Sequence, residues 1–127
     1  ENMPCRRIGP ICMEPHYYHH PDTLSQFQYL TFDTTHVGTR GTDLLAFFQK
    51  VELQVAHIHL SNFNGKEHQL PKHGFLPLTD LLKRLKMQAF PGLISLELNP
   101  TSLQADDESK LKENLRDSLS FCLQALQ

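Results

Sequence analysis

Four residues of types that hold divalent metal ions recur at comparable places in the chain: Glu1, Asp33, His59 and Glu97. Asp33 closes the apolar run YLTFD, His59 lies near the end of VAHIHL, and Glu97 lies near the end of LISLEL. Carboxylate and imidazole groups together suit Mn²⁺, Mg²⁺, Co²⁺ or Zn²⁺. A carboxylate in an apolar strand such as that of Glu97 is costly to bury unless it is paired or metal-bound. The pattern therefore favours one shared site.

The elements that must position these side chains follow from the apolar pattern. Strands are expected at residues 29–33, 54–60 and 93–98, and polar loops at 1–21, 34–41, 61–74 and 99–104. Helices are expected at 22–28, from 42 or 43 to 50, from 77, and from 106 or 107 to the end. Alternating strands and helices predict an α/β fold with a parallel sheet, which presents its chemistry at the carboxyl ends of the strands.

The composition of the chain limits the classes of protein to which it can belong. The 127 residues fit one domain or part of a larger one, and 39% hydrophobic with 20% charged residues indicates a globular chain. A net charge of −2 makes nucleic acid an unexpected partner. No apolar run approaches the roughly 20 residues of a membrane span, and no signal peptide is evident. Three cysteines without CxxC spacing are expected to be reduced thiols in a cytoplasmic protein.

Several motifs resemble a known family. DTTH (33–36), HIHLSN (57–62), EHQLPKHG (67–74) and SLELNP (95–100) look like the last four β/α units of the xylose isomerase-like TIM barrels, and Glu1-Asn2 resembles the end of their fifth strand. The resemblance implies an α/β fold in which residues 1–127 form the C-terminal half, strands 5–8, of one TIM (β/α)8 barrel domain. The chain is then expected to be a fragment whose partner is the N-terminal half of the barrel or another copy of itself.

The sugar isomerase and epimerase branch of this family suggests the leading function. By resemblance, one divalent metal (Mn²⁺, Mg²⁺ or Co²⁺) is held by Glu1, Asp33, His59 and Glu97. Glu1 and Glu97 would also transfer the proton next to the carbonyl of a sugar or sugar phosphate. The predicted substrate contacts are His36, His68, Arg40 and Lys66, with the two cations as phosphate contacts.

Other interpretations stay open. The apurinic endonuclease branch predicts a phosphodiesterase with two or three Zn²⁺ ions, but Lys66 stands where that branch has an Asp, whereas His68 is retained. An inactive barrel fragment is a third possibility. At the level of single residues, Asp33 can be a turn cap and His59 a core histidine, with His57 on the same strand face as its structural partner. Fold alone does not decide among these chemistries.

Overall fold

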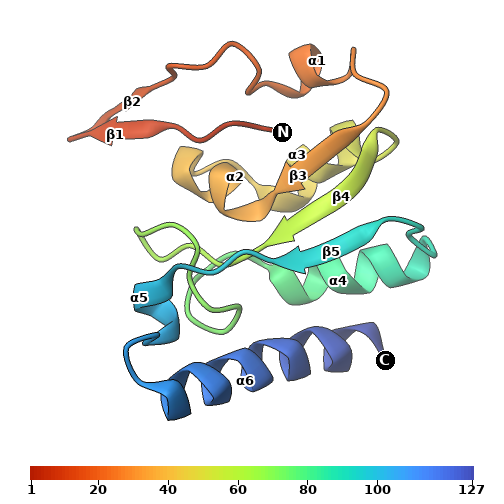
Figure 1. Ribbon diagram of the computed structural model, residues 1–127. Helices are drawn as coiled ribbons and strands as arrows, with labels where there is room; N and C mark the ends of the chain where they lie inside the picture. Colours follow the sequence, from red (N-terminus) through yellow and green to blue (C-terminus); the bar gives the residue numbers. More distant parts are fainter.

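A three-stranded parallel sheet forms the centre of the computed structural model, which describes residues 1–127 except for the side chain of Arg7. The strands are β3 (Leu30–Asp33), β4 (Val55–Leu60) and β5 (Leu93–Leu96), in the order β3-β4-β5 (Figure 1). The predicted parallel α/β architecture is therefore confirmed. In the described chain the sheet has three strands, not the four of a half barrel.

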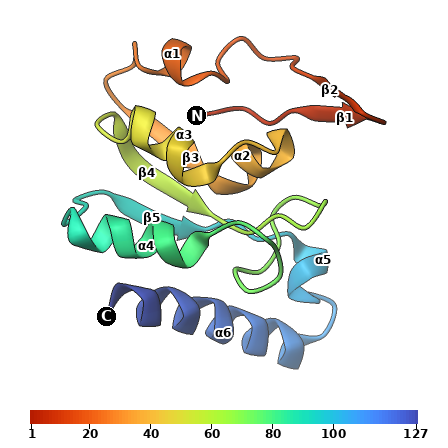
Figure 2. The ribbon, with the colours of Figure 1, turned by 180° about the vertical axis from the view of Figure 1, so that it is seen from behind.

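Helices cover one face of this sheet. Viewed from behind, α2 (Thr34–Arg40), α3 (Leu44–Val51) and α4 (Leu78–Met87) lie in front of the strands (Figure 2). The long α6 (Glu108–Leu126) runs beside α4, on the side away from α2 and α3. None of the helices in the described part of the chain has the length and apolar character needed to cross a membrane.

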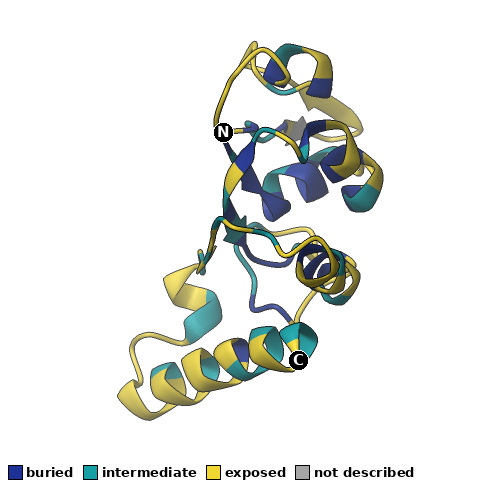
Figure 3. Ribbon diagram, turned by 90° about the vertical axis from the view of Figure 1, so that its right-hand side faces the viewer, coloured by how far each residue is buried: buried dark blue, intermediate teal, exposed yellow. Residues whose placement is uncertain are grey.

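The core lies between the sheet and these helices, as the buried segments in Figure 3 show. Phe32, Ile58 and Leu60 point toward the helices and are fully buried. Because successive strand residues face opposite sides, the alternate positions Asp33, His57 and His59 must lie on the other face. The apolar alternation of the strands thus decides which side of the sheet carries the chemistry.

The segment 34–41, expected to be a loop, is instead mostly the helix α2. Threonine and glycine are weak helix formers, so local propensity favours the wrong assignment. The helix forms because the Asp33 carboxylate caps it, accepting a bond from the His36 backbone N–H, and because Gly41 ends it with φ 68°. Val37 is fully buried beneath the sheet and adds packing energy that propensity does not count.

The first 21 residues, also expected to be a loop, contain a hairpin of β1 (Arg6–Ile8) and β2 (Ile11–Met13). Gly9, at φ 60°, allows the tight turn between them. Cys5 and Cys12 are joined as a disulfide across this hairpin, with Cα atoms 5.8 Å apart. The expectation of three reduced thiols is therefore wrong for this pair and holds for Cys122.

Two short helices also differ from expectation. The first, α1 (Pro21–Leu24), is shorter than the predicted 22–28 and begins at a proline after His20. The second, α5 (Pro100–Leu103), occupies the predicted loop 99–104 and is capped by Asn99. The predicted boundaries of α3, α4 and α6 are close to those observed, since Asp43, Pro77 and Asp107 precede their first turns.

Candidate functional site

Strand register brings the predicted site residues to one edge of the sheet. Asp33 pairs with His59 across β3 and β4, and His59 pairs with Ser95 across β4 and β5. Glu97 follows the end of β5, two residues beyond Ser95 and on the same face. Three neighbouring parallel strands therefore end with an acid, an imidazole and an acid, as the sequence pattern predicts.

The first cluster consists of Glu1, Asp33 and His59, whose ligand-type atoms all lie within 4.8 Å of one another. His59 Nδ1 lies 3.9 Å from both Glu1 Oε1 and Asp33 Oδ2. It also lies 2.6 Å from Glu97 Oε2. His59 thus stands among all three carboxylates, and the four residues singled out in the sequence are neighbours.

Two buried polar atoms in this cluster have no hydrogen-bond partner: Asp33 Oδ2 and His59 Nδ1. The short contact of His59 Nδ1 with Glu97 brings the atoms close but lacks hydrogen-bond alignment. Buried polar atoms in folded proteins are almost always satisfied, and each exception calls for an explanation. A carboxylate oxygen and an imidazole nitrogen that are both unsatisfied and adjacent have the chemistry of two metal ligands.

Glu97 is less buried than its apolar flanks suggest. Its side chain is 46% exposed, because β5 ends at Leu96 and the sheet has no further strand beyond β5 in the described chain. Solvent therefore hydrates part of the Glu97 carboxylate, so Glu97 does not need a partner to offset burial. Asp33 does need one, because its side chain is fully buried.

Asp33 carries the strongest electrostatic perturbation of the site. Burial raises the pKa of this carboxyl to about 6, although the charges of His36 and His68 and the bond from the His36 backbone act in the opposite direction. One oxygen, Oδ1, caps α2 by accepting from the His36 N–H at 3.0 Å. The capping role considered for Asp33 is therefore real, and it leaves Oδ2 free to act as a ligand.

His36, at the start of α2, is held by three acceptors at its Nδ1 atom. These are the Asn2 carbonyl at 2.9 Å, Glu1 Oε1 at 3.2 Å and Asp33 Oδ2 at 3.9 Å. We therefore assign the proton to Nδ1. Burial alone would lower the pKa of His36, but its contacts with Glu1, Asp33 and Asn2 raise it overall. The hydrogen bond with His36 lowers the pKa of Glu1.

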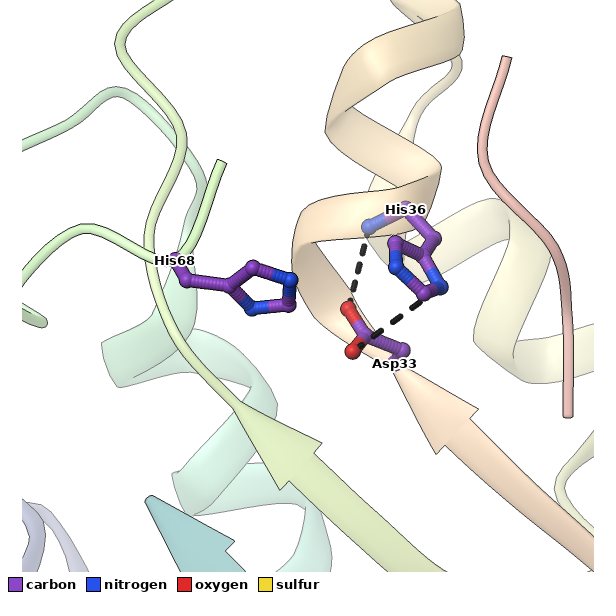
Figure 4. A group of neighbouring side chains, drawn as sticks. All are labelled: Asp33, His36 and His68. Carbon is purple, nitrogen blue, oxygen red and sulfur yellow. Dashed lines mark hydrogen bonds and ion pairs between the residues drawn. The ribbon is translucent and has the colours of Figure 1, made fainter. Parts of the chain in front are cut away.

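A second cluster shares Asp33 and consists of Asp33, His36 and His68 (Figure 4). His36 comes from α2, and His68 points toward Asp33 from the long loop on the opposite side. The Thr35 hydroxyl accepts from the His68 backbone N–H at 3.1 Å and donates to the Asn62 carbonyl at 2.9 Å. This buried threonine fixes the loop that carries His68.

Glu67 completes the surroundings of the two histidines. Its Oε2 lies 3.9 Å from His36 Nε2 and 4.0 Å from His68 Nε2. Lys66, which the resemblance aligns with an aspartate of the endonucleases, is exposed at the tip of the loop. The acidic group beside the histidines is therefore supplied by the next residue of the chain.

The structure does not bring Arg40 and Lys66 into either cluster. The Arg40 guanidinium contacts the Glu14 carboxylate and donates to the Met3 carbonyl at 3.3 Å. His57, considered as a structural partner, bonds Ser95 Oγ through Nε2 at 2.8 Å, and its ring lies edge-on to that of His59.

Three further residues of the site were not singled out as functional from the sequence: Asn2, Thr35 and Glu67. Glu67 is adjacent to His68 in a long polar loop, a signal that would have justified naming it. Asn2 and Thr35 act through contacts with residues more than 25 positions away, which no local pattern reveals.

Sequence comparisons find relatives without an assigned activity, and no family model matches the chain. The uncharacterized proteins Mb0509 of Mycobacterium bovis and Rv0498 of Mycobacterium tuberculosis are each 31% identical over 91 residues. Those residues are 68% of this chain but 32% of each relative. The chain therefore matches about one third of the length of these curated relatives.

Structural comparisons find two sugar epimerase folds. A D-tagatose 3-epimerase-like protein matches 94% of this chain and 46% of its own length, with TM-score 0.60 and 22% identity. D-psicose 3-epimerase from Clostridium cellulolyticum H10, solved with D-tagatose, matches 88% of this chain and 46% of its own length, with TM-score 0.67 and 15% identity. Both are xylose isomerase-like TIM barrels, so the resemblance predicted from the motifs is confirmed at the level of the fold.

Proposed function

We propose that the chain is the C-terminal half, strands five to eight, of a xylose isomerase-like barrel domain, and that this barrel is a metal-dependent sugar isomerase or epimerase. The fold shared with two sugar epimerases supports the general class. Residues 1–127 would then belong to one domain, with Glu1 and Asn2 at the end of the fifth strand. The outer edges of β3 and β5 pair with no strand of the described chain, which fits a sheet that continues on both sides.

The observation that carries the metal proposal is the pair of unsatisfied buried atoms, Asp33 Oδ2 and His59 Nδ1. Glu1 is close to both, and Glu97 contacts His59. This set of three carboxylates and one imidazole fits Mn²⁺, Mg²⁺ or Co²⁺. When bound, such an ion would polarise the carbonyl and hydroxyl oxygens of a sugar.

The two glutamates would handle the proton. Glu1 has a lowered pKa, so it is ionised at neutral pH and able to accept a proton from the carbon next to a carbonyl. Glu97 is half-exposed just beyond β5, and its Oε2 lies 2.6 Å from the same His59 Nδ1 atom that Glu1 Oε1 approaches to 3.9 Å. A sugar bound between Glu1 and Glu97 would have a carboxylate near each face, as the exchange of a proton in an epimerisation requires.

Substrate contacts would come from the second cluster. The Nδ1 of His36 is occupied by the Asn2 carbonyl, so Nε2 is the atom available to a sugar oxygen. His68 faces the same region from the long loop. Arg40 and Lys66 stay predicted contacts for a sugar phosphate. The remaining partner would be the N-terminal half of the barrel, or a second copy covering the open edges.

Metal binding and proton exchange together test this proposal. We expect the purified protein to bind about one Mn²⁺ per chain by calorimetry. We also expect it to exchange the proton next to the carbonyl of D-tagatose in D₂O, followed by NMR. Asp33→Asn should weaken Mn²⁺ binding at least tenfold, and Glu97→Gln should slow exchange by about two orders of magnitude, the typical contribution of a general acid or base.

The matched control is Glu108→Gln, an exposed glutamate at the start of α6, which should change neither quantity. Absence of Mn²⁺ binding in the unmodified protein would refute the ligand assignment. Mn²⁺ binding without exchange on ketoses would leave the metal site and refute the isomerase activity.

A hydrolase is the second candidate, because the cluster of Asp33, His36 and His68 lies next to the first and has Glu67 beside it. This hypothesis predicts two or three tightly bound Zn²⁺ ions and cleavage of a phosphodiester such as bis(4-nitrophenyl) phosphate. His68→Ala should then remove one metal and the cleavage together. One bound metal and no cleavage would exclude it.

A further inference from the structure

A cleft of about 540 Å³ opens between the β1–β2 hairpin and the long loop 61–74, above α2. Its walls are mostly apolar and include Ile8 and Met13 from the hairpin and Phe63 from the loop. Ile8 is 64% exposed and Met13 49% exposed, although both lie on a surface where polar side chains would cost nothing. Apolar side chains that face an open cleft indicate a binding surface.

Glu67 connects this cleft to the site already described. Its side chain lines the cleft, and its Oε2 lies 3.9 Å from His36 Nε2 and 4.0 Å from His68 Nε2. Because Glu67 is 42% exposed and borders both the histidines and the cleft, a ligand that contacts the two histidines would lie next to the cleft. The occupant that the geometry favours is the remote end of the same ligand.

The charges of the cleft argue against a phosphate at that end. Among the described side chains that line it, Arg6 is the one cation and Glu67 the one anion, so the charges cancel. A phosphate carries a charge of nearly −2 and is usually held by several cations or backbone N–H groups. Ile8, Met13 and Phe63 offer none of these, but they fit an alkyl or aryl group.

We propose that this hairpin–loop cleft is a substrate subsite that binds an apolar group on the end of the sugar remote from the reacting carbon. The proposal rests on the proposed function, since it takes the reacting end to lie over His59 and His36. It makes Glu67 the residue at which the sugar ends and the apolar group begins, with its carboxylate accepting a bond from a sugar hydroxyl.

Three ligands with the same reacting end test the proposal: D-tagatose, D-tagatose 6-phosphate and 6-O-octanoyl-D-tagatose. The chain contains no tryptophan, so Met13→Trp places a single fluorescent reporter in the cleft. Met87→Trp is the matched control, since Met87 is 80% exposed at the end of α4 and outside the cleft lining. All titrations are made with Mn²⁺ present and below the concentration at which the ester forms micelles.

We expect the ester to change the emission of Met13→Trp and to bind at least tenfold more tightly than D-tagatose, the gain from burying about two methylene groups. The 6-phosphate should bind no more tightly than D-tagatose, and the emission of Met87→Trp should not change. Ile8→Gln should abolish the advantage of the ester. Ile11→Gln should keep it, because Ile11 is equally exposed, at 64%, but does not line the cleft.

Other results would overturn the proposal. If Mn²⁺ and D-tagatose bind but the ester has no advantage, or the phosphate binds more tightly, the subsite is refuted while the proposed function stands. Sedimentation could also show a dimer that is dissociated by Ile8→Gln but not by the ester. In that case the cleft is an interface between copies of the chain. If neither Mn²⁺ nor D-tagatose binds, the proposed function fails, and the subsite fails with it.

Discussion

The side-chain amide of Asn2 bonds both backbone groups of Asp33. Asn2 Nδ2 donates to the Asp33 carbonyl at 2.9 Å, and Asn2 Oδ1 accepts from the Asp33 N–H at 2.7 Å. Both residues are buried, with Asn2 2% exposed and Asp33 fully enclosed. One side chain thus replaces a neighbouring strand at the open edge of β3, at Asp33, the residue whose carboxylate β3 presents to the site.

Replacing Asn2 should therefore damage both stability and metal binding. Asn2→Ala leaves a buried N–H and C=O of Asp33 without partners, which costs about 1–3 kcal/mol. We expect a lower midpoint of thermal unfolding and weaker Mn²⁺ binding by calorimetry. Asn64→Ala, an exposed asparagine in the long loop, is the control. Unchanged metal affinity in a destabilised Asn2→Ala protein would show that Asn2 supports the fold and not the site.

Asp33→Asn should change how stability depends on pH in the metal-free protein. The folded-state pKa of Asp33 is raised to about 6, above the value near 4 of an unfolded chain, so the folded state holds its proton longer. Its contribution is favourable below about pH 4 and is lost as pH rises toward 6. The loss amounts to about 1–3 kcal/mol, at about 1.4 kcal/mol per pKa unit.

The asparagine variant has no such titration. We expect its melting temperature to exceed that of the unmodified protein at pH 8 by more than it does at pH 4. Saturating Mn²⁺ should reverse the order at pH 8, because only the unmodified protein gains the full stabilisation from the ion. Equal pH profiles for the two proteins would contradict the assigned pKa.

Thr35→Val should release the loop that carries His68. Valine keeps the shape of threonine but cannot accept from the His68 N–H or donate to the Asn62 carbonyl. We expect faster amide hydrogen exchange in residues 62–70 and a stability loss of about 1–3 kcal/mol. Thr42→Val, at an exposed position before α3, should have neither effect. An unchanged rate of amide hydrogen exchange in residues 62–70 would mean that other contacts hold the loop.

Gly38→Ala should destabilise the protein, against the usual trend for a helix. Alanine in place of glycine normally stabilises a helix interior by about 1 kcal/mol. At position 38, however, the added Cβ would lie 2.7 Å from the Cβ of Phe63, closer than such atoms approach. Overpacking of this kind costs about 1–3 kcal/mol.

The test is rescue by a second change. Phe63→Ala keeps the Cβ of residue 63 but removes the aromatic ring. The backbone of the loop can then shift into the space that the ring occupied. We expect the double variant to be more stable than the sum of the two single changes predicts, measured by urea unfolding. Additive losses would show that Gly38 and Phe63 do not compete for space.

Much of the fold and part of the site follow from local sequence. The strands β3, β4 and β5 and the helices α3, α4 and α6 are predicted correctly, because apolar periodicity and capping residues are encoded within each element. Asp33, His59 and Glu97 come together because neighbouring parallel strands end at one edge. Their role as metal ligands is a prediction still to be measured.

The remainder depends on contacts between distant residues. The helix α2 exists despite its threonines and glycine because Asp33 caps it and the Thr34 hydroxyl donates to the Ser61 carbonyl at 2.6 Å. The bonds of Asn2 to Asp33 span 31 positions. Pairing of Cys5 with Cys12 depends on a hairpin whose strands are too short to show alternation.

The bonds from Thr34 to the backbone of Ser61 have a consequence for how such a chain can evolve. They join the ends of β3 and β4 directly, since the Thr34 hydroxyl both donates to the Ser61 carbonyl and accepts from its N–H at 3.0 Å. The distance between neighbouring strand ends is then independent of the loops that follow. Insertions and substitutions can accumulate in those loops while Asp33 and His59 keep their spacing, which suits a fold that persists at 15% and 22% identity.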